Sequence, residues 1–321
     1  QSADASISHY EIAEARLWNI PGQPERIEAE GLAKGMPFTI LLATDTPAEL
    51  SGPQKPWSLK LDVQGPDMSL AVEGRMEKAF VWDTFDYRIA ISGNQVDALE
   101  KLFDLEFPTT GPFKISAAVN AAEGLYRVTD FVAHVHGAPG TPDIKITNGD
   151  ASGGQDHPLL VELQGKYGDA PLTLTFKSEQ TFEVSSQTTP WPLEARLNLA
   201  DIQFDVRGTV APATAGESFE LDGQLQGETL TTLAQLLGSE LPKAGPYQFS
   251  FRTRFGEGSY EVTDLEGYLR NTELWKTIHI VQGKASGHQN GLVKASIEAK
   301  LDNVPLSLSF QGGSETSTEA N

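Results

Sequence analysis

Two histidines separated by one residue, His134 and His136 in the segment HVHG, have the spacing that most directly suggests chemistry. In an extended strand, side chains two positions apart lie on the same face, so both imidazoles could bind one metal ion. A related segment later in the chain has Tyr268 and Arg270 at the matching positions. Because a short motif needs supporting context and this pair is not repeated, we interpret it as structural or solvent-exposed and predict no metal site.

A glycine-rich run from Asn148 to Asp156 contains the oxygen-bearing side chains that a calcium-binding turn uses. In the related segment, Lys284 replaces Asp150 and Asn290 replaces Asp156. A cation site would not survive that exchange. The run is therefore predicted to be a glycine-rich hairpin without a metal ion.

Two pairs of closely spaced carboxylates, Asp83 with Asp86 and Glu28 with Glu30, could serve as acid–base pairs. The chain contains 44 Asp and Glu residues, however, so such spacings arise by chance. No nucleophile, histidine partner or GxSxG turn accompanies either pair. We therefore predict that the protein is not an enzyme and that it uses no cofactor.

The composition restricts the class of protein. Of the 321 residues, 24 are Lys or Arg and 44 are Asp or Glu, which gives a formal net charge of −20. This charge repels phosphate backbones and no basic cluster stands out, so nucleic acid is not an expected partner. The absence of cysteine excludes disulfides and thiolate chemistry. The apolar runs are far shorter than the ~20 residues of a membrane-spanning helix.

An internal repeat organises the sequence. The distance along the chain from Trp57 to Trp191 is the same as that from Asp130 to Asp264. This offset holds without insertion over roughly a hundred residues, which identifies a true repeat. The chain is therefore divided into the end of a preceding repeat (residues 1–55), a full β-repeat (56–189), a second β-repeat (190–311) and a polar, disordered tail (312–321).

Period-2 alternation of apolar and polar residues dominates both repeats and predicts about eight β-strands in each. The expected fold is therefore all-β, with one short helix in each repeat. Alternating apolar residues share one face of a strand. The residues expected to form this inner face are Leu59, Leu61, Val63, Leu70, Val72, Phe113, Ile115, Leu193, Leu197, Ile202, Phe204, Val206, Tyr247, Phe249 and Phe251.

One helix is predicted in each repeat because apolar residues there follow helical spacing and form one stripe. Prolines follow both stripes and prevent the helices from continuing. Each helix is interpreted as a plug that covers an otherwise open face or edge of the sheet. The plug residues are Leu99, Leu102 and Phe103 in the first repeat, and Leu233, Leu236 and Leu237 in the second.

The second repeat contains a motif of apolar residues, prolines and a glycine, which is followed by an alternating strand and the segment VTDLEG. The motif consists of Leu233, Leu236, Leu237, Leu241, Pro242, Gly245, Pro246 and Tyr247. It resembles the AsmA family of bacterial envelope proteins, which is related to bridge-like lipid transporters. The first repeat carries the same motif in a weaker form, and the resemblance covers most of residues 56–311. It is a pattern of apolar positions with a few Pro and Gly residues and carries no catalytic signature.

The resemblance implies an elongated, curled repeat sheet that forms an open apolar groove, a half-pipe or "taco". It also implies an inner-membrane helix outside this chain, a periplasmic location and a part in outer-membrane biogenesis. The chain would then be a non-enzymatic segment of a lipid conduit that transfers phospholipids between the two membranes. Its partners would be phospholipid acyl chains, with envelope membrane proteins at either end.

An alternative remains open at this point. Alternation alone is also typical of the core of a closed β-sandwich. The chain would then be a structural or adhesive β-repeat protein that binds protein or glycan partners. An open groove would expose more apolar surface than the few hundred Å² that a soluble monomer normally exposes. The two interpretations therefore differ in whether the apolar faces are covered.

Overall fold

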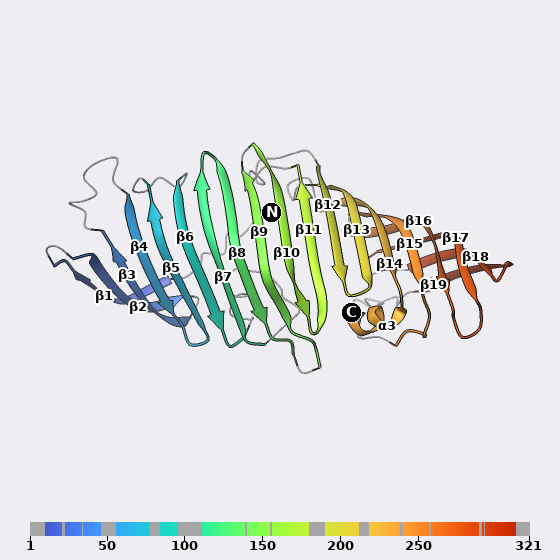
Figure 1. The fold of residues 1–321 in the computed structure, drawn as a ribbon, viewed down its shortest axis with the longest axis horizontal. Helices are drawn as coiled ribbons and strands as arrows, with labels where there is room; N and C mark the ends of the chain where they lie inside the picture. The colour runs from blue at the N-terminus through green and yellow to red at the C-terminus, as the bar shows by residue number, and fades with distance from the viewer. Residues whose placement is uncertain are drawn as a thin grey trace, which may run out of the picture. The chain divides into compact units, whose positions relative to one another are not determined.

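The computed structural model describes residues 10–312 of the chain, except residues 21–22, 34, 46–55, 78–83, 96–110, 139, 155, 180–189, 212–217, 238–239, 257, 289–290 and 292. Its 19 strands form one antiparallel sheet that is not closed, and one short helix accompanies them within the described residues (Figure 1). The prediction of an all-β fold with an open sheet is therefore confirmed. No helix in the described part of the chain is long and apolar enough to cross a membrane.

The chain divides into two compact units, of which the first comprises residues 1–156 and 163–169 and the second residues 157–162 and 170–321. The strands up to residue 154 are β1 (Tyr10–Trp18), β2 (Glu25–Ala33), β3 (Met36–Thr44), β4 (Trp57–Gln64), β5 (Met68–Met76), β6 (Phe85–Gly93), β7 (Phe113–Ala122), β8 (Leu125–Val135) and β9 (Ile144–Gly154).

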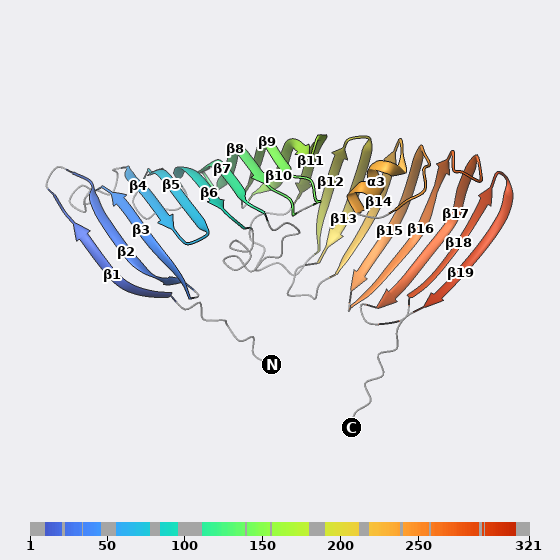
Figure 2. The same cartoon turned by 90° about the horizontal axis from the view of Figure 1, so that it is seen from below.

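The remaining strands are β10 (His157–Tyr167), β11 (Ala170–Ser178), β12 (Trp191–Leu199), β13 (Ile202–Val210), β14 (Phe219–Gly227), β15 (Tyr247–Gly256), β16 (Ser259–Arg270), β17 (Thr277–His288), β18 (Val293–Leu301) and β19 (Val304–Gly312). The helix α3 (Leu230–Leu237) connects β14 to β15. From β1 to β9, and again from β11 to β19, each strand pairs with the next one in the chain, so the strands lie side by side in sequence order (Figure 2).

The internal repeat is visible strand by strand. The bounds of β14, β15 and β19 follow those of β6, β7 and β11 at the same offset that separates Trp191 from Trp57. An irregularity recurs as well, because the pairing shifts register after Ser116 in β7 and after Ser250 in β15. Asp130 and Asp264, in the strands paired with these, both adopt a φ of 52°. Both repeats therefore fold on one template that includes its β-bulge.

Strand β11 illustrates why these segments form strands with two different faces. Leu172, Leu174 and Phe176 are half-buried, whereas Thr173 and Thr175 between them are exposed. Branched and aromatic residues fit the pleated surface, and their period of two places all the apolar side chains on one side. The same alternation recurs along the other strands, so the sheet has an apolar face and a polar face.

Helix α3 begins beside the turn between β12 and β13. Asp201 in this turn accepts hydrogen bonds at 3.0 Å from the backbone N–H groups of Glu228 and Thr229. Burial acts to raise the pKa of Asp201, but the hydrogen bonds from Thr232, Thr229 and Glu228 together hold this pKa below its ordinary value. A carboxylate is thus fixed at the helix N-terminus, where it satisfies free N–H groups and complements the helix dipole.

The helix packs on the apolar face. Leu230 is buried together with Ala244 and Tyr247, and Leu233 packs against this cluster. In both views α3 lies beside the end of β14 (Figures 1 and 2). The predicted second helix is therefore confirmed, and it covers one end of the apolar face. Leu236 and Leu237 belong to α3, but their side chains lie outside the described residues, as does the whole of the predicted first helix with Leu99, Leu102 and Phe103.

The predicted glycine-rich hairpin is present, but most of the run is strand. Residues from Asn148 up to Gly154 are the second half of β9, which pairs with the next strand, β10. A glycine weakens a strand, but here it makes room: a Cβ atom at Gly149 would meet the side chains of Leu163 and Phe131. The predicted disordered tail lies outside the described residues beyond Gly312.

Candidate functional site

The apolar face of the sheet is built from rows of side chains that run across the strands. In the second repeat the strand register aligns Leu197 of β12 with Leu174 of β11 and Phe204 of β13. The same row continues through Leu225 of β14 to Phe249 of β15. Each of these side chains lies on the same side of the sheet as its neighbours, so the row is continuous from β11 to β15.

The first repeat contains the equivalent row at the same register. Val63 of β4 pairs with Leu70 of β5, and the row continues through Ile91 to Ile115 of β7. Beside it, Leu61 pairs with Val72, while Ala195 pairs with Val206 in the second repeat. The strand register therefore brings the predicted inner-face residues together on one face in each repeat. That set is Leu59, Leu61, Val63, Leu70, Val72, Phe113 and Ile115 in the first repeat, and Leu193, Leu197, Ile202, Phe204, Val206, Tyr247, Phe249 and Phe251 in the second.

Exposure along the apolar face depends on whether anything covers it. Tyr247, beneath α3, is 1% exposed, whereas Phe249 and Phe251 of the same strand are only half-buried. On β19, for which a lateral neighbour is described on one side only, Leu308 is 55% and Phe310 is 62% exposed. Side chains inside a sheet are crowded by their lateral neighbours, so half-burial is the level expected where no second layer lies on top. Apart from the region under α3, the described residues supply no such layer over this row.

Three of the predicted inner-face residues are more deeply buried than the rest. Phe113, Ile202 and Tyr247 are 3%, 4% and 1% exposed. Phe113 packs with Ile91 and other residues near the strand ends, and Tyr247 is covered by α3. Phe113 and Tyr247 therefore belong to small closed clusters, and a ligand on the apolar face would contact the half-buried residues of that face.

Several aromatic rings lie flat on the sheet over glycines of the neighbouring strand. Gly223 is paired with Phe251, and a Cβ atom at Gly223 would collide with the Phe251 ring. Gly227 and Tyr247 have the same relationship. An aromatic side chain that covers a glycine protects its backbone and fixes the register of the two strands.

The polar face carries ladders of opposite charges. The Arg252 guanidinium contacts Asp222 at 2.9 Å and Asp264 at 3.3 Å, and Arg196 contacts Asp205. Hydrogen bonding to Asp222 and the nearby negative charges raise the pKa of Arg252 above its ordinary value. These pairs line a hollow of about 750 Å³. Because these charges are exposed and paired with one another, each ion pair contributes little to stability.

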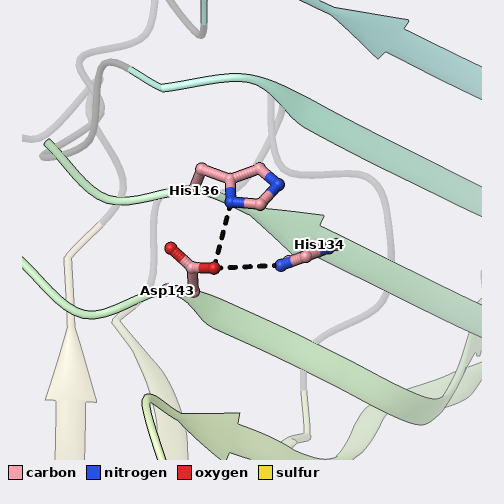
Figure 3. A group of neighbouring side chains, drawn as sticks. All are labelled: His134, His136 and Asp143. Atoms are coloured by element: carbon pink, nitrogen blue, oxygen red, sulfur yellow. Dashed lines mark hydrogen bonds and ion pairs between the residues drawn. The ribbon is translucent and has the colours of Figure 1, made fainter.

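A second cluster of side chains lies on the polar face, where β8 ends and β9 begins. His134 Nε2 and His136 Nδ1 lie 3.2 Å and 3.0 Å from the same Asp143 oxygen, Oδ2 (Figure 3). One ligand atom from each of the three residues lies within 4.8 Å of the others, so the group could hold a metal ion. The spacing of the histidines was visible in the sequence, but Asp143 was not identified. The only signal for it was its place directly before the strand-like segment that begins at Ile144.

Two of the carboxylates that were considered as acid–base pairs lie opposite basic or amide side chains of the neighbouring strands. Glu28 lies across from Arg16 in the pairing of β1 with β2, and Asp86 lies across from Asn120 and Arg75. Asp83 lies outside the described residues. Asn148 and Asp150 contact each other at 3.4 Å on an exposed part of β9, which does not resemble a calcium-binding loop.

Comparisons of the chain with models of protein families, with curated proteins and with solved structures found no match. The function therefore has to be argued from the apolar face and the histidine cluster themselves.

Proposed function

We propose that the chain is a non-enzymatic lipid-binding segment whose apolar face holds the acyl chains of phospholipids. The observation that carries this proposal is the difference in exposure along one face. Tyr247 beneath α3 is 1% exposed, while Phe249 and Phe251 on the same face of the same strand are only half-buried. A protein that needed this face only as a core would bury it throughout, as α3 buries Tyr247.

The chemistry of the rows argues for an apolar and flexible occupant. The row from Leu174 to Phe249 consists of Leu and Phe side chains, which offer no hydrogen bond to a ligand. Burying methylene groups against such a row contributes about 0.8 kcal/mol for each group, so a long acyl chain gains more than a small metabolite does. The ion-paired polar face stays in water, which leaves a lipid only the apolar face to occupy.

A closed β-sandwich, the alternative expectation, is less consistent with this arrangement. The described strands belong to one sheet that is not closed, and half-buried Leu197 and Phe204 are not covered by a second sheet within the described residues. The resemblance to the AsmA family supports the further proposal that the chain works in the periplasm. There it would form part of a conduit for phospholipids between the inner and outer membranes and would meet envelope membrane proteins at either end.

The experiment that tests the proposal places a charge on the apolar face. Leu197→Asp and its counterpart in the first repeat, Val63→Asp, each put a carboxylate into the row where an acyl chain would lie. Each variant should bind less phospholipid than the unmodified chain, by roughly twofold or more, because a charge is poorly solvated beside an acyl chain. The amount of fluorescent phospholipid that elutes with the protein after incubation with vesicles gives the readout.

Matched controls are provided by the next residue of each strand, which lies on the polar face. Asn198→Asp and Gln64→Asp add the same charge and should leave lipid binding unchanged. Urea unfolding of all four variants checks that they remain folded, as expected for substitutions at half-exposed positions. Equal lipid binding by Leu197→Asp and Asn198→Asp would rule the apolar face out as the lipid site. Unfolding of Leu197→Asp alone would instead indicate a closed core.

A further inference from the structure

The strand register explains how three separated residues meet on the polar face. His134 pairs with Lys145, and Val135 pairs with Ile144, so the next pair in this antiparallel ladder is His136 with Asp143. Residues two apart share a face, which puts His134 and His136 on the same side as Asp143. The ladder thus places both imidazoles and one carboxylate around a single point at the end of β8.

The connection between the strands holds the carboxylate in place. The backbone N–H of Gly137 donates a hydrogen bond of 3.1 Å to Asp143 Oδ1, which leaves Oδ2 turned towards the two rings. Gly137 also approaches the backbone of Thr141 too closely to carry a side chain.

The distances from Asp143 Oδ2 to the two ring nitrogens match those between ligands around one metal ion. Ligand atoms at about 2.1 Å from a metal are separated by about 3.0 Å in an octahedral site and about 3.4 Å in a tetrahedral site. The distances of 3.0 Å and 3.2 Å from Asp143 Oδ2 to the ring nitrogens of His136 and His134 fall in this interval. The two rings are close neighbours, with centroids 4.1 Å apart and an interplanar angle of 43°.

We infer that His134 Nε2, His136 Nδ1 and Asp143 Oδ2 form a binding site for a divalent transition-metal cation of the Zn²⁺ class. Two imidazoles and a carboxylate suit such ions better than Ca²⁺ or Mg²⁺, which prefer all-oxygen ligands. The side chains are 40%, 47% and 44% exposed, so a bound ion would be reached from solvent and would keep positions open for water or another ligand. The formal net charge of −20 also favours the approach of a cation.

Two lysines limit the affinity of this site. Lys114 and Lys145 are the neighbours of His134 on the two adjacent strands, and both are exposed. Their ammonium groups oppose a nearby cation, but solvent screens them. The site is therefore expected to bind a transition metal in the micromolar range rather than as tightly as a closed structural zinc site. It lies on the face opposite the apolar rows, so it does not depend on the proposed lipid function.

The test uses the full chain without an affinity tag, first treated with a chelator and then titrated with Co²⁺. Binding of Co²⁺ to nitrogen and oxygen ligands produces visible absorption bands, and Zn²⁺ should displace it because Zn²⁺ binds such sites more tightly. We expect one equivalent of Co²⁺ to bind. His136→Ala and Asp143→Asn should each weaken binding by about tenfold or more, since even the loss of a supporting contact has effects of that size.

Two further variants keep the test decisive. His157→Ala removes an exposed histidine at the start of β10 and should leave the titration unchanged. The triple variant His134→Tyr, His136→Arg, Asp143→Thr introduces the residues that the second repeat carries at this register, so the fold has already accommodated them. It should abolish Co²⁺ binding while retaining the circular dichroism of the unmodified chain. No Co²⁺ or Zn²⁺ binding by the unmodified chain, or equal binding by the triple variant, would overturn the inference.

Discussion

The two repeats have equivalent apolar faces, but they differ on the polar face where one strand connects to the next. The row from Val63 to Ile115 in the first repeat has its counterpart in the row from Leu197 to Phe249 in the second, residue for residue at the same register. The connection from β8 to β9 and that from β16 to β17 also have the same register. Their side chains, however, are unrelated.

At the end of β16 in the second repeat, Tyr268 and Arg270 occupy the positions of the two histidines. The Arg270 guanidinium lies 4.6 Å from the centre of the Tyr268 ring. The backbone N–H of Asn271 donates to the carbonyl of Lys276, and Asp302 accepts a hydrogen bond from the N–H of Thr277. The same strand register is therefore reached with a different backbone conformation and a different set of contacts in the connection. The fold does not require the histidine–aspartate cluster of the first repeat, which leaves that cluster available for a local role.

On the apolar face, large and small side chains have changed places between the two repeats. Ile89 pairs with Ala117 in the first repeat, whereas Gly223 pairs with Phe251 at the equivalent place in the second. A large side chain on one strand accompanies a small one on its neighbour in both cases, but the strands have exchanged them. The apolar face thus keeps its total volume while individual residues change, as a packed layer requires.

We expect the largest effect on stability at the position of the apolar face that is buried in both repeats. Tyr247 and its counterpart Phe113 are 1% and 3% exposed. Tyr247→Ala should lower the free energy of unfolding by about 3–5 kcal/mol because it opens a cavity under α3. Urea unfolding of the variant measures this loss.

The matched control for this variant is Tyr247→Phe, which introduces the residue type of Phe113. The Tyr247 hydroxyl is buried without a hydrogen-bond partner, and burial raises the pKa of Tyr247. Its removal should therefore leave stability unchanged or raise it by about 1 kcal/mol. A loss below about 1 kcal/mol in Tyr247→Ala would show that the helix does not cover this residue, and the contrast between covered and open regions would fail.

A smaller effect is expected at the exchanged pair. Gly223→Ile should destabilise the protein by about 1–3 kcal/mol, because its side chain would collide with the Phe251 ring. The double variant Gly223→Ile, Phe251→Ala recreates the pair of the first repeat and should recover most of that loss in urea unfolding. If the double variant is less stable than Gly223→Ile alone, the two repeats do not share one packing template at this position.

Most of the fold was predictable from the sequence because it rests on two periodicities. The alternation of apolar residues, as in Leu193, Ala195 and Leu197, specifies strands and one apolar face, and the constant offset between matching residues specifies their repetition. The helical stripe at Leu230 and Leu233 predicted α3, and the structure confirms this helix. These features are local, so a single sequence contains them.

The features that sequence reasoning missed depend on pairing between strands. Asp143 meets His134 and His136 only because the ladder aligns residues on opposite sides of a connection, and no spacing in the sequence encodes that register. The glycine-rich run was predicted to be a hairpin, but the sequence did not show that Gly149, Gly153 and Gly154 belong to the strand itself. Their place in a strand follows from the side chains of Leu163 and Phe131, which occupy the space beside Gly149.

The central claim is that the apolar face binds lipid, and native mass spectrometry of the purified chain followed by lipid extraction tests it most directly. The open apolar rows predict bound phospholipid, at one or more molecules for each repeat, either retained from the cells or taken up from added vesicles. A mass that corresponds to the chain alone, before and after incubation with phospholipid vesicles, would contradict the claim.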